Sequence, residues 1–322
     1  MRFKGIILLL LLGSMQNGFS QSPEDKLLID SLREVAESNV HDTIRIKALS
    51  DWDNLVYYYD KEQDLLLNQE ILNICELHQH STSLSAREYD LYGLAAQNAH
   101  NNLGLTLSEL GDFGLSVKHF YKSMQISEAR QDSYGIAKAH NNLGLTYQEQ
   151  HLFDKAIEHH ELAFNACDDC MAVHQSYYNN MGVVYSLMDK NELAKSFFIK
   201  GLEFIDPETD QSPKANLYVN IADLFAKVKE YDSAHYYYRQ ALPIYLETND
   251  ITGLAYVYTY GAATYLKAGN INKALEEIEM GRKYARMSGT VVYESKALSV
   301  AYDIYSKAGI KDSLISIMNQ RY

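Results

Sequence analysis

Asparagines recur in this chain at a fixed interval and could hold a peptide backbone. Asn102 and Asn142 are 40 residues apart, and each follows another asparagine. An asparagine side chain offers both a hydrogen-bond donor and an acceptor, so it can pair with a peptide bond without reading the ligand's side chain. The alternative is that these amides bond within the protein's own fold. The candidate peptide-binding residues are Asn101, Asn102, Asn141, Asn142, Asn179, Asn180 and Asn220.

Two cysteines stand close together in the segment Cys167-Asp168-Asp169-Cys170. In an oxidising compartment they could form a local disulfide, and otherwise they are free thiols. A redox motif is disfavoured, because aspartates between the thiols would raise rather than lower the thiolate pKa. The third cysteine, Cys75, is expected to be a small buried apolar residue.

Histidines gather between residues 100 and 160, and we expect them to be packing residues. His100 and His140 occupy the place that tyrosine holds in the later copies of the same pattern. No His-Glu-x-x-His spacing or adjacent carboxylate pair predicts a zinc site. Nor does a nucleophile with a base, a phosphate loop or a paired-acid motif predict catalysis, so we expect no enzyme, metal or cofactor. The other histidines of this group are His119, His151, His159 and His160.

A repeating pattern must position these residues. The string Ala-His-Asn-Asn-Leu-Gly-Leu-Thr fills residues 99–106 and returns unchanged at residues 139–146. Twelve, 16 and 19 residues after its glycine come a small, a large and a small residue, spacings that share one face of a second helix. One helix pair alone cannot bury such a face, so neighbouring pairs must stack. The small residues in register are Gly104, Gly144, Gly182, Ala222 and Ala262.

This order of small and aromatic residues resembles the tetratricopeptide repeat. Gly111–Phe113, Glu230–Asp232 and Lys267–Asn270 lie where that family turns between its two helices. The resemblance implies an all-α, right-handed superhelical solenoid of antiparallel helix pairs, with the asparagines facing a concave groove. The step of 40 residues exceeds the usual period of about 34, which predicts longer helices. HEAT-like repeats share a period of about 40, but nothing in them requires this placement of small residues.

The first 20 residues are expected to be a signal peptide. Arg2 and Lys4 precede the apolar run Ile6–Leu12, and small residues suit cleavage before Gln21. The run is too short to span a bilayer, and a buried amphipathic helix is disfavoured because the run has no polar face. No cysteine directly follows the cleavage site to carry a lipid, and no other segment is apolar over 18 residues. We therefore expect a periplasmic or secreted protein without a transmembrane segment.

The mature chain is expected to begin with one helix in residues 21–43 and to continue as a solenoid over residues 44–322. A divergent unit at 44–79 precedes clear repeats over about 86–285, and another divergent unit, at about 290–322, ends the chain. Residues 29–32 and 41–43 resemble the start of exported bacterial tetratricopeptide proteins, many of which continue into a membrane helix and a histidine kinase or DNA-binding domain. This implies an alternative, the sensory part of a signal-transduction system.

Charge and composition limit the classes of partner that this chain could bind. After signal cleavage the chain has 27 basic and 42 acidic residues, a formal net charge of −15. This charge disfavours nucleic acid and anionic membranes as partners. The expected groove has few basic residues, so a carboxylate terminus is disfavoured as ligand, and the 26 tyrosines supply rigid contact area. We predict a non-enzymatic, exported scaffold that binds a peptide or protein segment, with the asparagines serving binding rather than stability.

Overall fold

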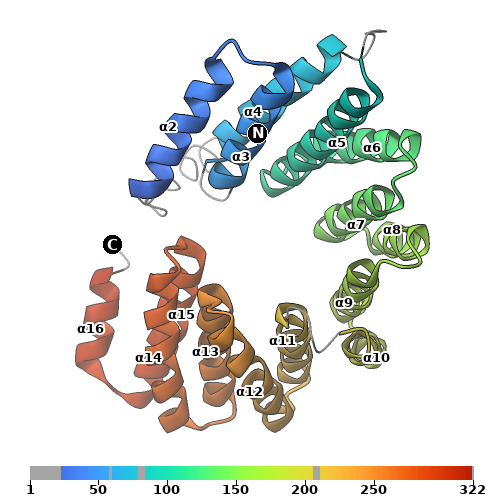
Figure 1. The fold of residues 1–322 in the computed structure, drawn as a ribbon. Coiled ribbons are helices and arrows are strands. Elements are labelled where there is room, and N and C mark those ends of the chain that lie inside the picture. Colours follow the sequence, from blue (N-terminus) through green and yellow to red (C-terminus); the bar gives the residue numbers. More distant parts are fainter. Residues whose placement is uncertain (1–22, 58–59, 79–83, 206–210, 321–322) are drawn as a thin grey trace, which may run out of the picture. The chain divides into compact units, whose positions relative to one another are not determined.

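The computed structural model describes residues 23–57, 60–78, 84–205 and 211–320, and all regular structure there is helical (Figure 1). The chain divides into two compact units, residues 1–180 and 181–322. The predicted signal peptide lies outside the described residues. Among the described helices, none has the length and apolar character that crossing a membrane requires.

The first unit consists of helices that pack in chain order, each against the next. The pairs α5 with α6 and α7 with α8 are the two repeats that share the identical string. The helices are α2 (Pro23–Glu37), α3 (Asp42–Val56), α4 (Lys61–His78), α5 (Ala86–Glu109), α6 (Phe113–Ala129), α7 (Ser133–Glu149) and α8 (Phe153–Ala166).

The second unit follows the same plan, and α9 (Met171–Leu187) is the helix in which the division between the units falls. The pairs α11 with α12 and α13 with α14 correspond to the fourth and fifth repeats. The remaining helices are α10 (Asn191–Leu202), α11 (Ser212–Lys227), α12 (Tyr231–Glu247), α13 (Ile251–Lys267), α14 (Ile271–Met287), α15 (Val291–Ala308) and α16 (Lys311–Gln320). The predicted all-α fold of paired helices is confirmed.

Turns between paired helices fall where the sequence predicts them. Gly111 links α5 to α6 with a φ of 80°, a left-handed conformation that favours glycine after a helix end. Gly269 does the same between α13 and α14, with a φ of 81°. Between α11 and α12 the left-handed residue is Lys229, at 67°.

The small residues of the repeat lie at helix crossings. A Cβ atom added to Gly104 would lie 2.5 Å from the ring of Phe120, and one added to Gly144 would lie 2.5 Å from His160. Ala222 and Ala262 are fully buried. The paired helices therefore approach so closely that these sites have no room for a larger side chain.

The link between the second and third repeats contains a disulfide. Cys167 ends α8 and bonds to Cys170, just before α9, with Cα atoms 5.4 Å apart. This is where the repeat step shortens to 38 residues. Cys75 is buried on α4, as the sequence predicts, and burial raises the pKa of its thiol to about 12.

Replacing Ala222 by leucine tests the predicted crossing. The larger side chain must displace atoms at a fully buried site, so we expect a loss of about 1–3 kcal/mol in the free energy of unfolding. The control is Ala268→Leu, at an exposed residue just after α13. Urea unfolding curves measure both, and an unchanged midpoint for Ala222→Leu would contradict the assigned packing.

Candidate functional site

The asparagines of α5, α7 and α9 form hydrogen bonds between successive repeats, which we call the amide ladder. The Nδ2 atom of Asn142 donates to Oδ1 of Asn101 at 2.8 Å. One repeat later, Nδ2 of Asn180 donates to Oδ1 of Asn141, also at 2.8 Å. Each bond joins the first helix of a repeat to the first helix of the preceding one.

The ladder begins on α3 with a carboxylate instead of an amide. Nδ2 of Asn102 donates to Oδ2 of Asp53 at 3.0 Å. Asp53 also accepts from Asn68 at 2.8 Å, and Thr106 donates to Asp64 at 2.5 Å. Burial and the neighbouring Asp53 carboxylate raise the pKa of Asp64 to about 7. No pattern in the sequence predicted this buried polar cluster.

Hydrogen bonds also join the two adjacent asparagines within a repeat. Nδ2 of Asn101 donates to Oδ1 of Asn102 at 3.3 Å, and Asn179 donates to Asn180 at the same distance. A carboxamide has two N–H donors and two acceptor lone pairs. The ladder bonds therefore use only part of the hydrogen-bonding capacity of an asparagine.

The predicted binding residues differ in their exposure. Asn101, Asn142 and Asn180 are buried, at 3%, 7% and 8% exposure, so they chiefly join the repeats. Half-buried asparagines are the ones a ligand could reach, and a role in peptide binding stays a prediction for all seven. The half-buried ones are Asn102, Asn141 and Asn179 in the first unit and Asn220 on α11 in the second.

In the second unit tyrosine side chains supply most of the corresponding polar contacts. Asp223 on α11 accepts hydrogen bonds from the hydroxyls of Tyr238 and Tyr256, the latter at 2.7 Å. The Tyr256 ring stacks on Tyr260, with centroids 4.1 Å apart, and the Lys296 ammonium lies 5.1 Å from the Tyr260 ring. Burial raises the pKa of Asp223. Tyr260 stands 40 residues after Asn220, so the same position changes from amide to aromatic.

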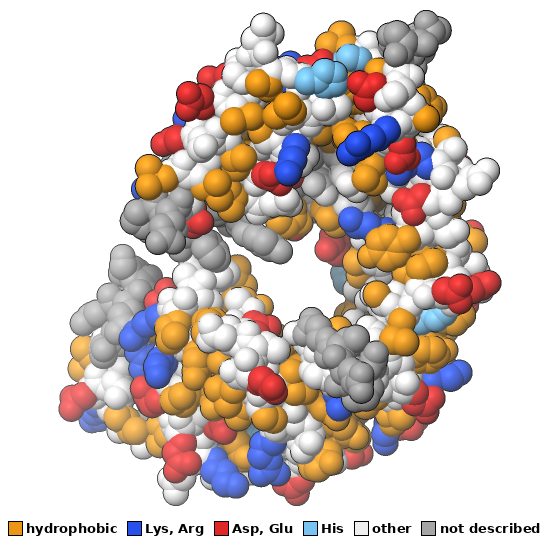
Figure 2. All heavy atoms as spheres, in the orientation of Figure 1, with side chains coloured by type: hydrophobic (Ala, Val, Ile, Leu, Met, Phe, Trp, Pro, Cys, Tyr) orange, Lys and Arg blue, Asp and Glu red, His pale blue; other side chains and the backbone are white. Residues whose placement is uncertain are grey.

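The surface mixes apolar and charged groups. Figure 2 shows hydrophobic side chains, tyrosine included, spread among acidic and basic ones on the visible face. Such a surface offers both contact area and charge to a partner.

Comparison with known proteins agrees with this architecture. A sequence model of the tetratricopeptide repeat family matches residues 94–169 and 174–247. The chain contains tetratricopeptide repeats over these residues. No curated protein matches the sequence.

Solved tetratricopeptide structures share the fold at low sequence identity. The Rap conjugation gene regulator of plasmid pLS20, in complex with the Phr* peptide, is 14% identical, with a TM-score of 0.61 over 94% of this chain and 86% of that one. Apo RapI is 17% identical, with a TM-score of 0.60 over 82% and 92%. Aspartyl phosphate phosphatase F from Bacillus subtilis is 16% identical, with a TM-score of 0.57 over 94% and 91%. At these identities the likeness shows the fold alone.

Histidines pair across the two helices of a tetratricopeptide repeat. The Nδ1 atoms of His100 and His119 are 3.0 Å apart, as are those of His140 and His159 in the next repeat. Burial first, and then the partner ring, lowers the pKa of His100 and of His140 to about 4. These rings are therefore neutral at neutral pH. In the part of the chain that the structure describes, no three His, Cys, Asp or Glu side chains form a metal site.

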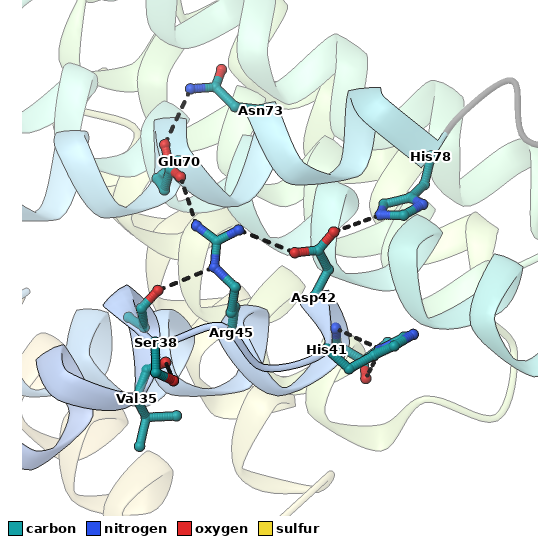
Figure 3. A network of polar contacts seen from close by, with 10 residues as sticks. Val35, Ser38, His41, Asp42, Arg45, Glu70, Asn73 and His78 are labelled. Atoms are coloured by element: carbon teal, nitrogen blue, oxygen red, sulfur yellow. Dashed lines mark hydrogen bonds and ion pairs between the residues drawn. The ribbon is translucent and has the colours of Figure 1, made fainter.

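A polar network ties α2 to α3 and α4, the helices of the divergent first unit (Figure 3). Asp42 contacts Nε2 of His78 at 2.8 Å and accepts from Arg45 at 3.1 Å. The hydrogen bond with His78 first, and then that with Arg45, lowers the pKa of the Asp42 carboxyl. Arg45 also donates to the backbone carbonyl of Ala36 at 3.1 Å and to Glu70 at 3.3 Å. Asp42, a residue of the motif that resembles exported proteins, therefore helps to hold Arg45 against the end of α2.

The double variant Asn142→Ala with Asn180→Ala tests the amide ladder. It removes two inter-repeat hydrogen bonds and leaves acceptors unpaired, so we expect a loss of about 1–3 kcal/mol in the free energy of unfolding. The control is Asn165→Ala, an exposed residue on α8 whose amide bonds only within its own helix. Equal stability of the double variant and the control would contradict a structural ladder.

The paired histidines predict acid sensitivity. Their pKa is lower in the folded than in the unfolded chain, so the unfolded state binds more protons between pH 6.5 and about 4. Stability should therefore fall as pH falls through this range, by about 1–2 kcal/mol at pH 5 for each of His100 and His140.

The variant His100→Tyr with His140→Tyr should flatten this pH dependence, since tyrosine holds the same position in later repeats. Chemical unfolding at pH 7.5, 6.5, 5.5 and 5.0 measures the effect. Parallel curves for the variant and the native protein would show that these histidines do not cause the loss.

Proposed function

We propose that this protein is an exported, non-enzymatic scaffold that binds an extended peptide or protein segment along the amide ladder of its first unit. One observation carries the proposal: Asn102 and Asn141 are half-buried amides on the first helices of successive repeats. Ladder bonds hold both side chains in place and leave part of their hydrogen-bonding capacity for a ligand. A peptide backbone needs such donors and acceptors at fixed intervals.

The residues beside the ladder suit side-chain contacts. Leu105 and Leu145 follow Asn101 and Asn141 by four residues, one helical turn, and are half-buried. An amide row can hold the backbone of a ligand while leucines contact its apolar side chains. The pLS20 regulator, of the same fold, was solved with a peptide, which supports this class of ligand.

Export is supported by the start of the chain. A basic and then apolar segment precedes the predicted cleavage before Gln21, and the described helix α2 begins at Pro23. A signal peptide removed at this point would leave the first helix intact.

The proposal is tested by selection from a random library of 12-residue peptides. The protein is purified from the exported fraction, where mass spectrometry should find an N-terminus near Gln21. We expect selected peptides to bind, and Asn141→Asp to weaken their binding about five- to tenfold, because this change removes the amide donors but keeps an oxygen for Asn180.

The control is Asn165→Asp on the exposed face of α8, which adds the same charge elsewhere. If both variants bind like the native protein, the ladder is not the binding site. An intact Met1 would contradict export, and a library that yields no binder would contradict the scaffold itself.

A further inference from the structure

Two glutamates occupy one position in successive repeats. Glu109 and Glu149 are 40 residues apart and end helices α5 and α7. Each lies four residues, about one helical turn, after Leu105 or Leu145, and therefore on the same face of its helix as that leucine. These carboxylates border the surface to which we assign peptide binding, so any role for them in recognition rests on that proposed function.

The protein itself neutralises the first of these carboxylates. The Nζ atom of Lys61 lies 2.6 Å from Oε2 of Glu109, and the hydroxyl of Tyr57 donates to Oε1 at 2.9 Å. Lys61 comes from the preceding repeat, at the start of α4. The chain therefore shows which group this position accepts, a primary ammonium that reaches it from one repeat earlier.

The second carboxylate, on Glu149, takes part in no ion pair with any residue that the structure describes. It is exposed and accepts a hydrogen bond from Ser108 of the preceding repeat at 3.2 Å. Lys138, on the same helix, is 11 residues away, about 16 Å along the axis, and is too distant to pair with it. Where Glu109 meets the ammonium of Lys61, Glu149 meets a hydroxyl.

The charge of the first unit favours a cation as the missing partner. This unit carries 13 lysines and arginines against 25 aspartates and glutamates, whereas the second carries 16 against 17. An acidic unit attracts a basic segment by long-range electrostatics, and a local carboxylate then fixes its position. In the second unit the same position carries Leu187 and then Lys227, Lys267 and Lys307.

We propose that Glu149 is a specificity-determining residue that binds a lysine or arginine side chain of the peptide ligand, as Glu109 binds Lys61. The ligand of the first unit is then an extended segment with apolar side chains for the leucines and a basic side chain for Glu149. The ladder holds its backbone, and Glu149 selects its charge.

Three fluorescent ten-residue probes test this: alternating leucine and lysine, leucine and glutamine, and leucine and glutamate. Anisotropy titrations of the purified protein should show the lysine probe binding best. Glu149→Gln should weaken that probe about two- to fivefold, as expected for an exposed ion pair, and leave the glutamine probe unchanged. Glu149→Lys should move the preference toward the glutamate probe.

A matched control separates local recognition from general attraction. Glu161→Gln makes the same charge change on the exposed face of α8, in the same unit. If Glu161→Gln and Glu149→Gln weaken the lysine probe equally, only the general field acts and the inference fails. A native protein that prefers the glutamine or glutamate probe would also overturn it, while leaving the scaffold intact. Failure of all three probes to bind would contradict the proposed function as well.

Discussion

Hydrogen bonds between asparagines on the first helices of successive repeats are the interaction on which the first unit depends. Apolar packing brings the helices of a repeat together at Gly104 and Gly144, but it does not by itself set the register between repeats. A buried carboxamide without a partner would cost about 1–3 kcal/mol, so Asn142 and Asn180 favour only the stacking that pairs them. The ladder thus specifies how neighbours stack and leaves one edge of the amide row accessible.

The second unit also pairs the polar groups between its helices, but it does so with different residues. Tyr256 and Tyr238 donate their hydroxyls to the half-buried carboxyl of Asp223, and the raised pKa of that carboxyl reflects its partial removal from water. The backbone plan is common to both units, but the exposed edge is amide-rich in one and aromatic in the other. One repeat architecture can therefore present two chemically different surfaces.

Much of the fold can be predicted from the sequence alone. The step of 40 residues, the small residues at crossings and the turn at Gly111 all arise from local pattern, since each depends on residues within one repeat. The pairing of asparagines in the ladder is harder to predict from the sequence, because Asn142 bonds to Asn101, 41 residues earlier, and not to its counterpart Asn102. The role of Asp53 was not predicted because it lies 49 residues before Asn102, outside the regular step.

The sequence therefore points to the asparagines but not to their separate environments. Repetition identifies the residues that form the ladder bonds. Their division into buried and accessible members depends on how adjacent helices meet, which no single repeat encodes, and their role in binding stays a prediction. The sequence does not single out Glu149 for a similar reason. Glu149 differs from Glu109 only in having no cation beside it among the residues that the structure describes, and the cation that pairs with Glu109 comes from another repeat.

Side-chain amide NMR tests the central claim most directly. In the free protein the Nδ2 hydrogens of Asn142 and Asn180 should exchange slowly with solvent, and those of Asn141 faster. A saturating peptide from the random-library selection should shift and protect the Asn141 signal while leaving the slow exchange of Asn142 in place. Rapid exchange at Asn142 in the free protein, or a bound peptide that perturbs no ladder asparagine, would contradict the account.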